Sequence, residues 1–139
     1  MTSTASVFLD TNILVYAAMA KDKEAARGNR ASELVRTVDF GVSAQVLQEF
    51  YTVVTRKGGT PLTPDEAFAW IERLIRLPCV AIDASLVLRA IWLSERYRID
   101  YWDGAILAAA ESLGAETLYT EDLSHGQIYG TVQAINPFV

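Results

Sequence analysis

Short apolar runs that alternate with longer helical patterns constrain this chain more than any other sequence feature. Five runs are short enough to be strands: 6–10, 40–42, 80–82, 117–120 and 132–135. The first run is continuously apolar until it ends in an acid, which is typical of a parallel strand buried on both faces. We therefore predict the α/β class, a three-layer α/β/α arrangement with a central, mostly parallel sheet.

Helix boundaries can be predicted from capping residues. Thr63-Pro64-Asp65-Glu66 forms a capping box with proline at the first helical position, so a helix should begin there and end before Pro78. Ser43 is the expected N-cap of a helix that runs to about Lys57, and Asp83 is the expected N-cap of a later one. Gly114 should end the helix over 101–113.

Two further helical segments precede these. Residues 12–18 have a helix-compatible pattern, and an alanine-rich, charged segment begins at Asp22. We expect this second helix to be interrupted or loosened near Gly28 and Asn29, because glycine and asparagine favour turns.

The chain is expected to form one domain over 1–139, because 139 residues with 51% hydrophobic content suffice for a single core. No apolar run approaches the roughly 20 residues that span a bilayer, and the first residues lack the pattern of a secretory signal. The single cysteine, Cys79, lies in an apolar string and is expected to be a buried structural thiol. These features predict a cytoplasmic protein that does not contact membranes.

Acidic residues end two of the predicted strands. Asp10 follows the first run, and Asp122 follows the run over 117–120. In open α/β sheets, ligands bind beyond the carboxyl ends of the strands, so both acids lie where a site is expected. Each acid also has a simpler interpretation, because Asp10 could cap the next helix and Asp122 could serve a turn.

Two more acids lie at informative positions on helices. Glu49 stands on a largely apolar helix, and Asp103 stands near a helix N-terminus. Taken singly, Glu49 could be a solvated helix position and Asp103 could simply favour the helix dipole. Four such coincidences together favour one shared site.

Four carboxylates suit a hard divalent cation, Mg²⁺ or Mn²⁺, which can activate water for phosphodiester hydrolysis. A zinc site of nitrogen and sulfur ligands is nearly excluded, because His125 and Cys79 are the only residues of their types. We interpret His125 as a loop residue. The net charge of −5 argues against a broad basic surface for nucleic acid, yet it permits a nuclease whose bound cations attract phosphate.

Five segments, in this order and spacing, resemble the PIN-domain ribonucleases, and in particular the toxins of VapBC-type toxin–antitoxin systems. The segments are 8–16 (FLDTNILVY), 43–50 (SAQVLQEF), 101–106 (YWDGAI), 119–123 (YTEDL) and 136–138 (NPF). The resemblance spans nearly the whole chain and maps the four acids of the family onto Asp10, Glu49, Asp103 and Asp122. Asn12 and Thr120 match the usual polar supports around the metal.

The resemblance implies Mg²⁺- or Mn²⁺-dependent cleavage of single-stranded or looped RNA. It makes Asp10 and Asp103 the principal metal ligands, while Glu49 and Asp122 complete the cage directly or through water. It also implies a homodimer and a small antitoxin partner, assembled as a heterotetramer or a larger complex. Five aromatics, many for a chain of this size, agree with an exposed interface unless they all pack inside: Tyr16, Phe68, Trp70, Trp92 and Tyr97.

Two other functions are compatible with parts of this pattern. A PIN-like domain could bind RNA or protein without catalysis, although retention of all four acids argues against it. Another metal-dependent phosphohydrolase could act on a small phosphate ester, but Asn12 stands where an Asp-x-Asp nucleophile pair would need a second acid. The sequence does not identify the RNA target or the antitoxin.

Overall fold

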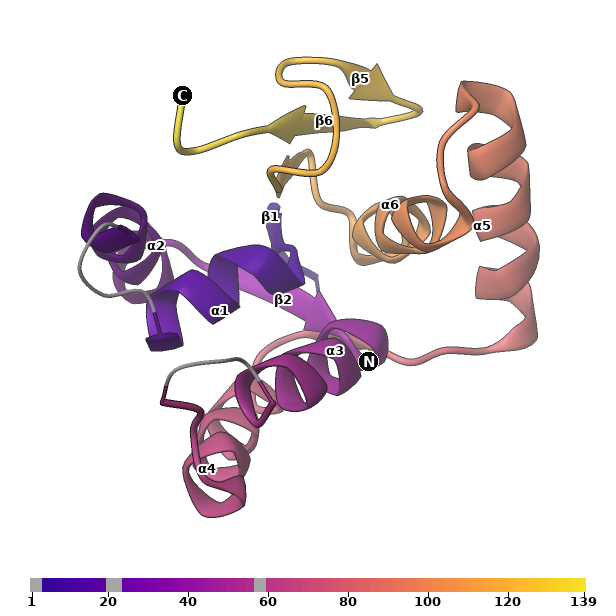
Figure 1. Ribbon diagram of the computed structural model, residues 1–139. Helices are drawn as coiled ribbons and strands as arrows, with labels where there is room; N and C mark the ends of the chain where they lie inside the picture. The colour runs from indigo at the N-terminus through magenta and orange to yellow at the C-terminus, as the bar shows by residue number, and fades with distance from the viewer. Residues whose placement is uncertain (1–3, 20–23, 57–59) are drawn as a thin grey trace.

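A six-stranded sheet forms the centre of the computed structural model, which describes residues 4–19, 24–56 and 60–139 (Figure 1). The strand order is β3-β2-β1-β4-β6-β5, and every neighbouring pair is parallel except β5 with β6. The strands are β1 (Val7–Leu9), β2 (Phe40–Ser43), β3 (Cys79–Val80), β4 (Thr117–Tyr119), β5 (Ile128–Tyr129) and β6 (Val132–Ile135).

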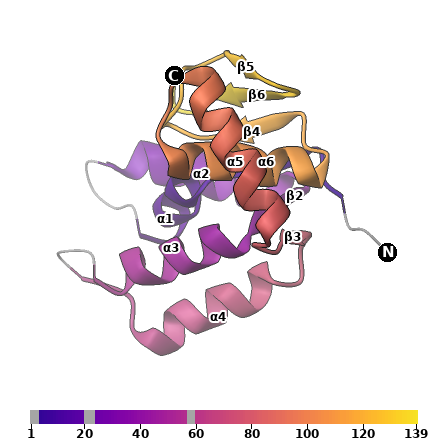
Figure 2. The same cartoon turned by 90° about the vertical axis from the view of Figure 1, so that its right-hand side faces the viewer.

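Helices cover both faces of this sheet. On one side of the sheet, α6 lies against the strands and α5 packs on the outside of α6. On the other side lie α1 and α2. Helix α3 directly follows β2 and pairs with α4 (Figures 1 and 2). The helices are α1 (Thr11–Met19), α2 (Ala25–Thr37), α3 (Ala44–Val54), α4 (Pro64–Leu74), α5 (Ala84–Tyr97) and α6 (Tyr101–Leu113). The predicted α/β/α layers are confirmed.

Helix α6 is the central helix of the core because it is apolar on nearly every side. It contacts β1, β2, β4 and β6, and most of its residues after the first turn are buried. Gly104 lets α6 approach α5 closely, since an added Cβ would lie 2.7 Å from the carbonyl oxygen of Ala90. Asp103, the residue before Gly104, therefore lies next to the closest approach of the two helices.

The predicted helix starts are confirmed by their cap hydrogen bonds. The hydroxyl of Ser43 accepts from the amide of Val46, and the carboxylate of Asp83 accepts from the amide of Leu86. Thr63 and Glu66 form both bonds of the capping box. Helix α6 has the predicted bounds, and α3 ends at Val54, before Lys57, which lies outside the described residues.

The predicted break near Gly28 and Asn29 is wrong, because α2 runs through both residues without interruption. Gly28 is one of the buried residues of α2, a helix that packs extensively on α1. Packing of the helix pair therefore outweighs the low helix propensity of these two residues. The expected start at Asp22 lies outside the described residues.

Two details at the edges of the sheet differ from prediction. Cys79 is exposed, so the prediction of a buried thiol is wrong; it lies on β3, a two-residue edge strand with a neighbour on one side only. Strand β5 was not predicted, because a two-residue strand is too short to show an alternating pattern. Among the described helices, none is long and apolar enough to cross a membrane.

Candidate active site

Asp10 and Asp122 lie at the carboxyl ends of adjacent strands. β1 pairs with β2 on one side and with β4 on the other, so the chain connections diverge from β1 in opposite directions. Such a switch point opens a crevice beyond the strand ends, where open α/β sheets bind ligands. Asp10 directly follows β1, and the segment 120–122 directly follows β4.

Asp10 is a buried carboxylate with two hydrogen-bond donors. Its Oδ1 accepts from the amide of Thr11 at 2.7 Å, and its Oδ2 accepts from the hydroxyl of Thr120 at 2.8 Å. Burial raises the pKa of Asp10 to about 7; the two hydrogen bonds lower it, and the charges of Asp122 and Glu49 raise it further. Asp10 thus directly precedes α1, with its carboxylate bonded to the first amide of the helix, and it also interacts with the charges of the other acids.

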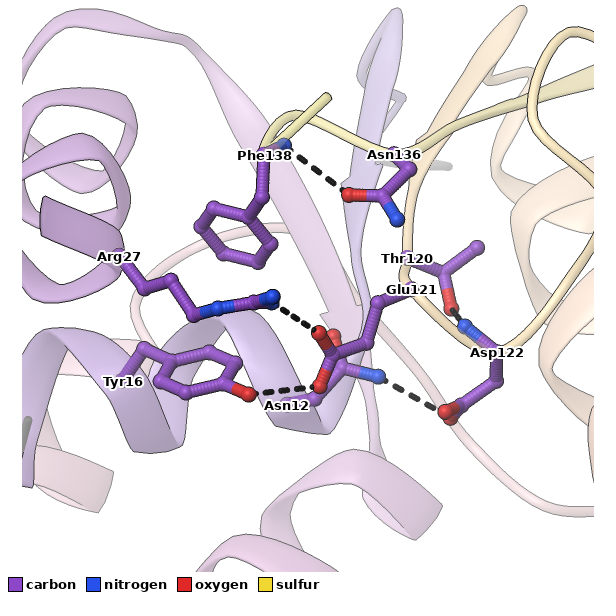
Figure 3. A network of polar contacts seen from close by, with 8 residues as sticks. All are labelled: Asn12, Tyr16, Arg27, Thr120, Glu121, Asp122, Asn136 and Phe138. Atoms are coloured by element: carbon purple, nitrogen blue, oxygen red, sulfur yellow. Dashed lines mark hydrogen bonds and ion pairs between the residues drawn. The ribbon is translucent and has the colours of Figure 1, made fainter. Parts of the chain in front are cut away.

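Thr120 links the two strand-end acids. Its fully buried hydroxyl donates to Asp10 and accepts from the amide of Asp122 at 3.1 Å. Asn12 supports the same acid, because its side-chain amide donates to Asp122 Oδ2 at 3.0 Å (Figure 3). Burial is the largest cause that raises the pKa of Asp122, and the bond from Asn12 opposes it.

Glu49 and Asp103 approach the same crevice from two helices. Thr11 donates its hydroxyl to Glu49 Oε1 at 2.7 Å, which ties α3 to the start of α1. Asp103 lies in the first turn of α6, half-buried. Burial raises the pKa of Asp103 to about 6, with further contributions from the charges of Asp122, Asp100 and Glu49.

The four predicted acids line one pocket of about 380 Å³. Asn12 also lines it, whereas the other predicted support, Thr120, lies behind Asp10 and acts through hydrogen bonds. Among the described residues that line this pocket, none is a lysine or an arginine. The raised pKa values of Asp10, Asp103 and Asp122 therefore reflect the burial of these carboxylates first and the negative charges of neighbouring acids second.

The donor set suits a hard cation, because carboxylate and amide oxygens are the ligands that Mg²⁺ and Mn²⁺ prefer. The side-chain oxygen of Asn12 is buried and has no hydrogen-bond partner among the described residues. Within the same residues, no three His, Cys, Asp or Glu side chains are grouped closely enough to hold a metal ion as they stand. The acids thus share a pocket whose side chains must rotate to coordinate one ion together.

A second polar network borders the pocket and was not predicted from the sequence. Glu121 accepts from the hydroxyl of Tyr16 at 2.8 Å and from Arg27 at 2.7 Å (Figure 3). The guanidinium of Arg27 also lies near the rings of Tyr16 and Phe138, with its carbon 5.7 and 5.1 Å from their centroids. In the sequence, only the position of Glu121 between Thr120 and Asp122 indicated this network.

His125 lies outside this pocket, as its interpretation as a loop residue implies. Its Nδ1 accepts from the amide of Asn136 at 3.0 Å, and the side chain of Asn136 accepts from the amide of Phe138. His125 therefore binds the segment that directly follows β6.

The PIN domain family model matches residues 7–130 of this chain. The chain belongs to the PIN domain family. The match includes the four acids and both predicted supports, and it leaves out only the last nine residues and the first six. Among curated protein sequences, none matches the chain significantly.

Several solved structures share the PIN fold of this chain. VapC20 of Mycobacterium tuberculosis, described as a toxin that cleaves the sarcin-ricin loop, is 23% identical over 84% of this chain and 90% of its own, with a TM-score of 0.64. A toxin–antitoxin complex from Klebsiella pneumoniae is 18% identical over 95% and 98%, with a TM-score of 0.69. VapBC2 of Rickettsia felis, bound to promoter DNA, is 20% identical over 92% and 96%, with a TM-score of 0.61.

Proposed function

We propose that this PIN-domain protein is a Mg²⁺- or Mn²⁺-dependent endoribonuclease and the toxin of a type II toxin–antitoxin system. The observation that carries the proposal is the pocket in which Asp10, Glu49, Asp103 and Asp122 lie together without a basic residue among the described lining. The similarity in fold to toxins, one of which is described as cleaving the sarcin-ricin loop, supports it. The substrate is single-stranded or looped RNA.

Asp10 and Asp103 are the proposed principal ligands of the cation. Their raised pKa values mean that a bound cation must displace protons, so metal affinity increases with pH up to about 7. Glu49 and Asp122 complete the cage directly or through water and orient the attacking water. The bound metal supplies charge stabilisation at the scissile phosphate and a more acidic water.

The supporting residues act through the acids. Thr120 holds Asp10 and the amide of Asp122 in one arrangement, and Asn12 holds the Asp122 carboxylate. Thr11 holds Glu49 toward the strand ends. These bonds keep the acids at the strand ends, so that only side-chain rotation is needed for them to coordinate one cation.

The decisive experiment measures cleavage of a labelled single-stranded RNA by the purified protein. EDTA should stop cleavage, Mg²⁺ or Mn²⁺ should restore it, and Ca²⁺ should support binding better than chemistry because its coordination is larger and looser. Asp10→Asn and Asp103→Asn should each abolish cleavage with the fold intact. Asp65→Asn, an exposed acid on α4, is the matched control and should keep the parent's rate.

Three results would contradict the proposal. Equal cleavage in excess EDTA would require a metal-free route. Parent-like cleavage by either Asn variant would remove the metal site. Binding of RNA without cleavage in any divalent metal would favour a non-catalytic PIN domain.

The cellular partner and target need a separate experiment. We propose that a small antitoxin covers the pocket. In support, one of the similar structures is described as a toxin–antitoxin complex and another as VapBC2 bound to promoter DNA. Sequencing RNA ends after induction of this protein in cells should reveal cuts at a few defined sites. Cuts spread over all RNA would contradict a dedicated target.

A further inference from the structure

Trp102 is a large aromatic side chain exposed at the rim of the acid pocket. It directly precedes Asp103, it lines the same pocket, and 60% of its surface is accessible. Val53, also substantially exposed, lines the pocket from α3. The pocket therefore has an apolar rim beside its carboxylates, and the proposed metal site does not use this rim.

The orientation of Trp102 is restrained by its neighbours. Its ring packs edge-to-face against Tyr101, with centroids 5.0 Å apart and planes at 82°. Its backbone oxygen accepts from the side-chain amide of Gln45, a buried residue of α3, at 3.3 Å. The bond from Gln45 holds the backbone of Trp102, and the contact with Tyr101 restricts the indole on one side, which reduces the conformational freedom lost when a ligand stacks on it.

The negative charge of the protein limits how RNA could be held at this pocket, and this limit bears on the role of the Trp102 ring. The chain has a net charge of −5, and none of the described lining residues is a lysine or an arginine. Phosphate contacts, which supply most of the affinity of nucleic-acid-binding proteins, are therefore few at this pocket. Aromatic stacking is an alternative source, because every base has a π-face and stacking needs no charge.

We propose that Trp102 forms a subsite for an unpaired nucleobase next to the scissile phosphodiester. This inference rests on the proposed ribonuclease function and adds a second recognition element to it. A base would stack on the exposed indole while its backbone phosphate would lie at the cation held by Asp103 and the other acids. A base in a duplex is already stacked and paired, so the subsite selects single-stranded or looped RNA.

The test combines protein variants with modified RNA. In Mg²⁺ or Mn²⁺, Trp102→Ala should raise KM for a short single-stranded RNA by about 5- to 150-fold and change kcat less, because stacking on one base contributes about that factor to affinity. Trp102→Tyr, which keeps an aromatic face, should recover most of the loss. Phe68→Ala is the matched control, because Phe68 is 59% exposed on α4 and does not line the pocket.

A set of RNAs with one abasic nucleotide at each position in turn identifies the base that stacks. For the parent protein, one abasic position beside the cleaved bond should raise KM by a factor similar to that of Trp102→Ala. The variant should cleave that abasic RNA and the intact RNA with the same KM, because the contact is already lost.

The outcomes separate this inference from the function on which it rests. If the parent cleaves no RNA in any divalent metal, the proposed function fails and the subsite fails with it. If the parent cleaves RNA and Trp102→Ala keeps the parent's KM, only the subsite is wrong. A variant whose KM is unchanged but whose sedimentation mass differs would assign Trp102 to a protein interface instead.

Discussion

Asp10 is a buried carboxyl group, 5% exposed, whose charged form is disfavoured by burial and by the nearby charges of Asp122 and Glu49. In the folded chain it holds its proton up to a pH of about 7, whereas its ordinary pKa is 3.8. Between these values the folded protein binds more protons than the unfolded chain, so raising the pH favours unfolding. Asp103 contributes in the same direction up to a pH of about 6.

We therefore predict that the metal-free protein loses stability as the pH rises from about 4 to about 7. The shift at Asp10 corresponds to roughly 4 kcal/mol at most, since one pKa unit equals about 1.4 kcal/mol. Urea unfolding in EDTA at four pH values measures this loss. Asp10→Asn should remove most of the slope, whereas Asp65→Asn should keep it. A slope that is identical in parent and Asp10→Asn would show that Asp10 is charged when folded.

The site residues follow rules that sequence alone can apply, up to a limit. Asp10 and Asp122 could be predicted because an acid after a buried strand lies at the carboxyl edge of the sheet. The partners that orient them could not, because Thr120 and Asp10 are 110 positions apart and meet only through strand pairing. The same reason applies to Arg27 and Glu121, whose ion pair joins α2 to the loop after β4.

At the scale of elements, local signals predicted helix boundaries well and helix packing poorly. Ser43, Thr63 and Asp83 begin their helices as expected, because each cap forms bonds within four residues. Gly28 was misread as a break, since α2 is held by tertiary packing that local propensity does not report. The two-residue strands β3 and β5 carry too little pattern for their pairing, or the exposure of Cys79, to be predicted.

Gly104 offers a test of how helix packing controls the site. Gly104→Ala would place a methyl group 2.7 Å from the carbonyl oxygen of Ala90 and 3.0 Å from Cβ of Ser94, so α5 and α6 must separate. We expect a loss of about 1–3 kcal/mol in unfolding free energy, as for other overpacked cores. At temperatures below the melting transition, the cleavage rate of Gly104→Ala should also be several-fold lower than that of the parent, because the adjacent Asp103 moves with α6.

Thr63→Ala is the control for this experiment. It removes the cap of α4 and costs about 1 kcal/mol, but α4 does not line the pocket. Its cleavage rate should equal that of the parent wherever both are folded. Equal rates for Gly104→Ala and Thr63→Ala would show that the spacing of α5 and α6 does not position Asp103.

At the scale of the whole molecule, exposed apolar side chains gather on α5. Leu88 is 69% exposed, Trp92 50% and Ile91 45%, at positions that share one side of the helix. Of the five aromatics singled out in the sequence, Phe68 and Trp92 are exposed, while Tyr16, Trp70 and Tyr97 pack partly against the core. Apolar groups gathered in this way mark interfaces more often than solvent-exposed surface.

We predict a homodimer at micromolar concentration in which this face of α5 is buried against a second copy. Sedimentation of the parent should give twice the chain mass, and Leu88→Asp should give the monomer because it buries a charge at the interface. The helical circular dichroism of the variant should be unchanged. A parent that sediments as a monomer, alone and with a co-expressed antitoxin, would remove the dimer.

The pairing of β1 with β4 also determines when the acid pocket can assemble during synthesis of the chain. Asp10 is synthesised about 100 residues before β4, the strand that brings Asp122 beside it, and α6 with Asp103 is synthesised just before β4. At roughly 5–20 residues per second, synthesis of this stretch takes about 5–20 seconds, during which only one half of the pocket exists. The nuclease activity that we propose would therefore be absent until β4 joins β1, which would spare the messenger and ribosome that produce the chain.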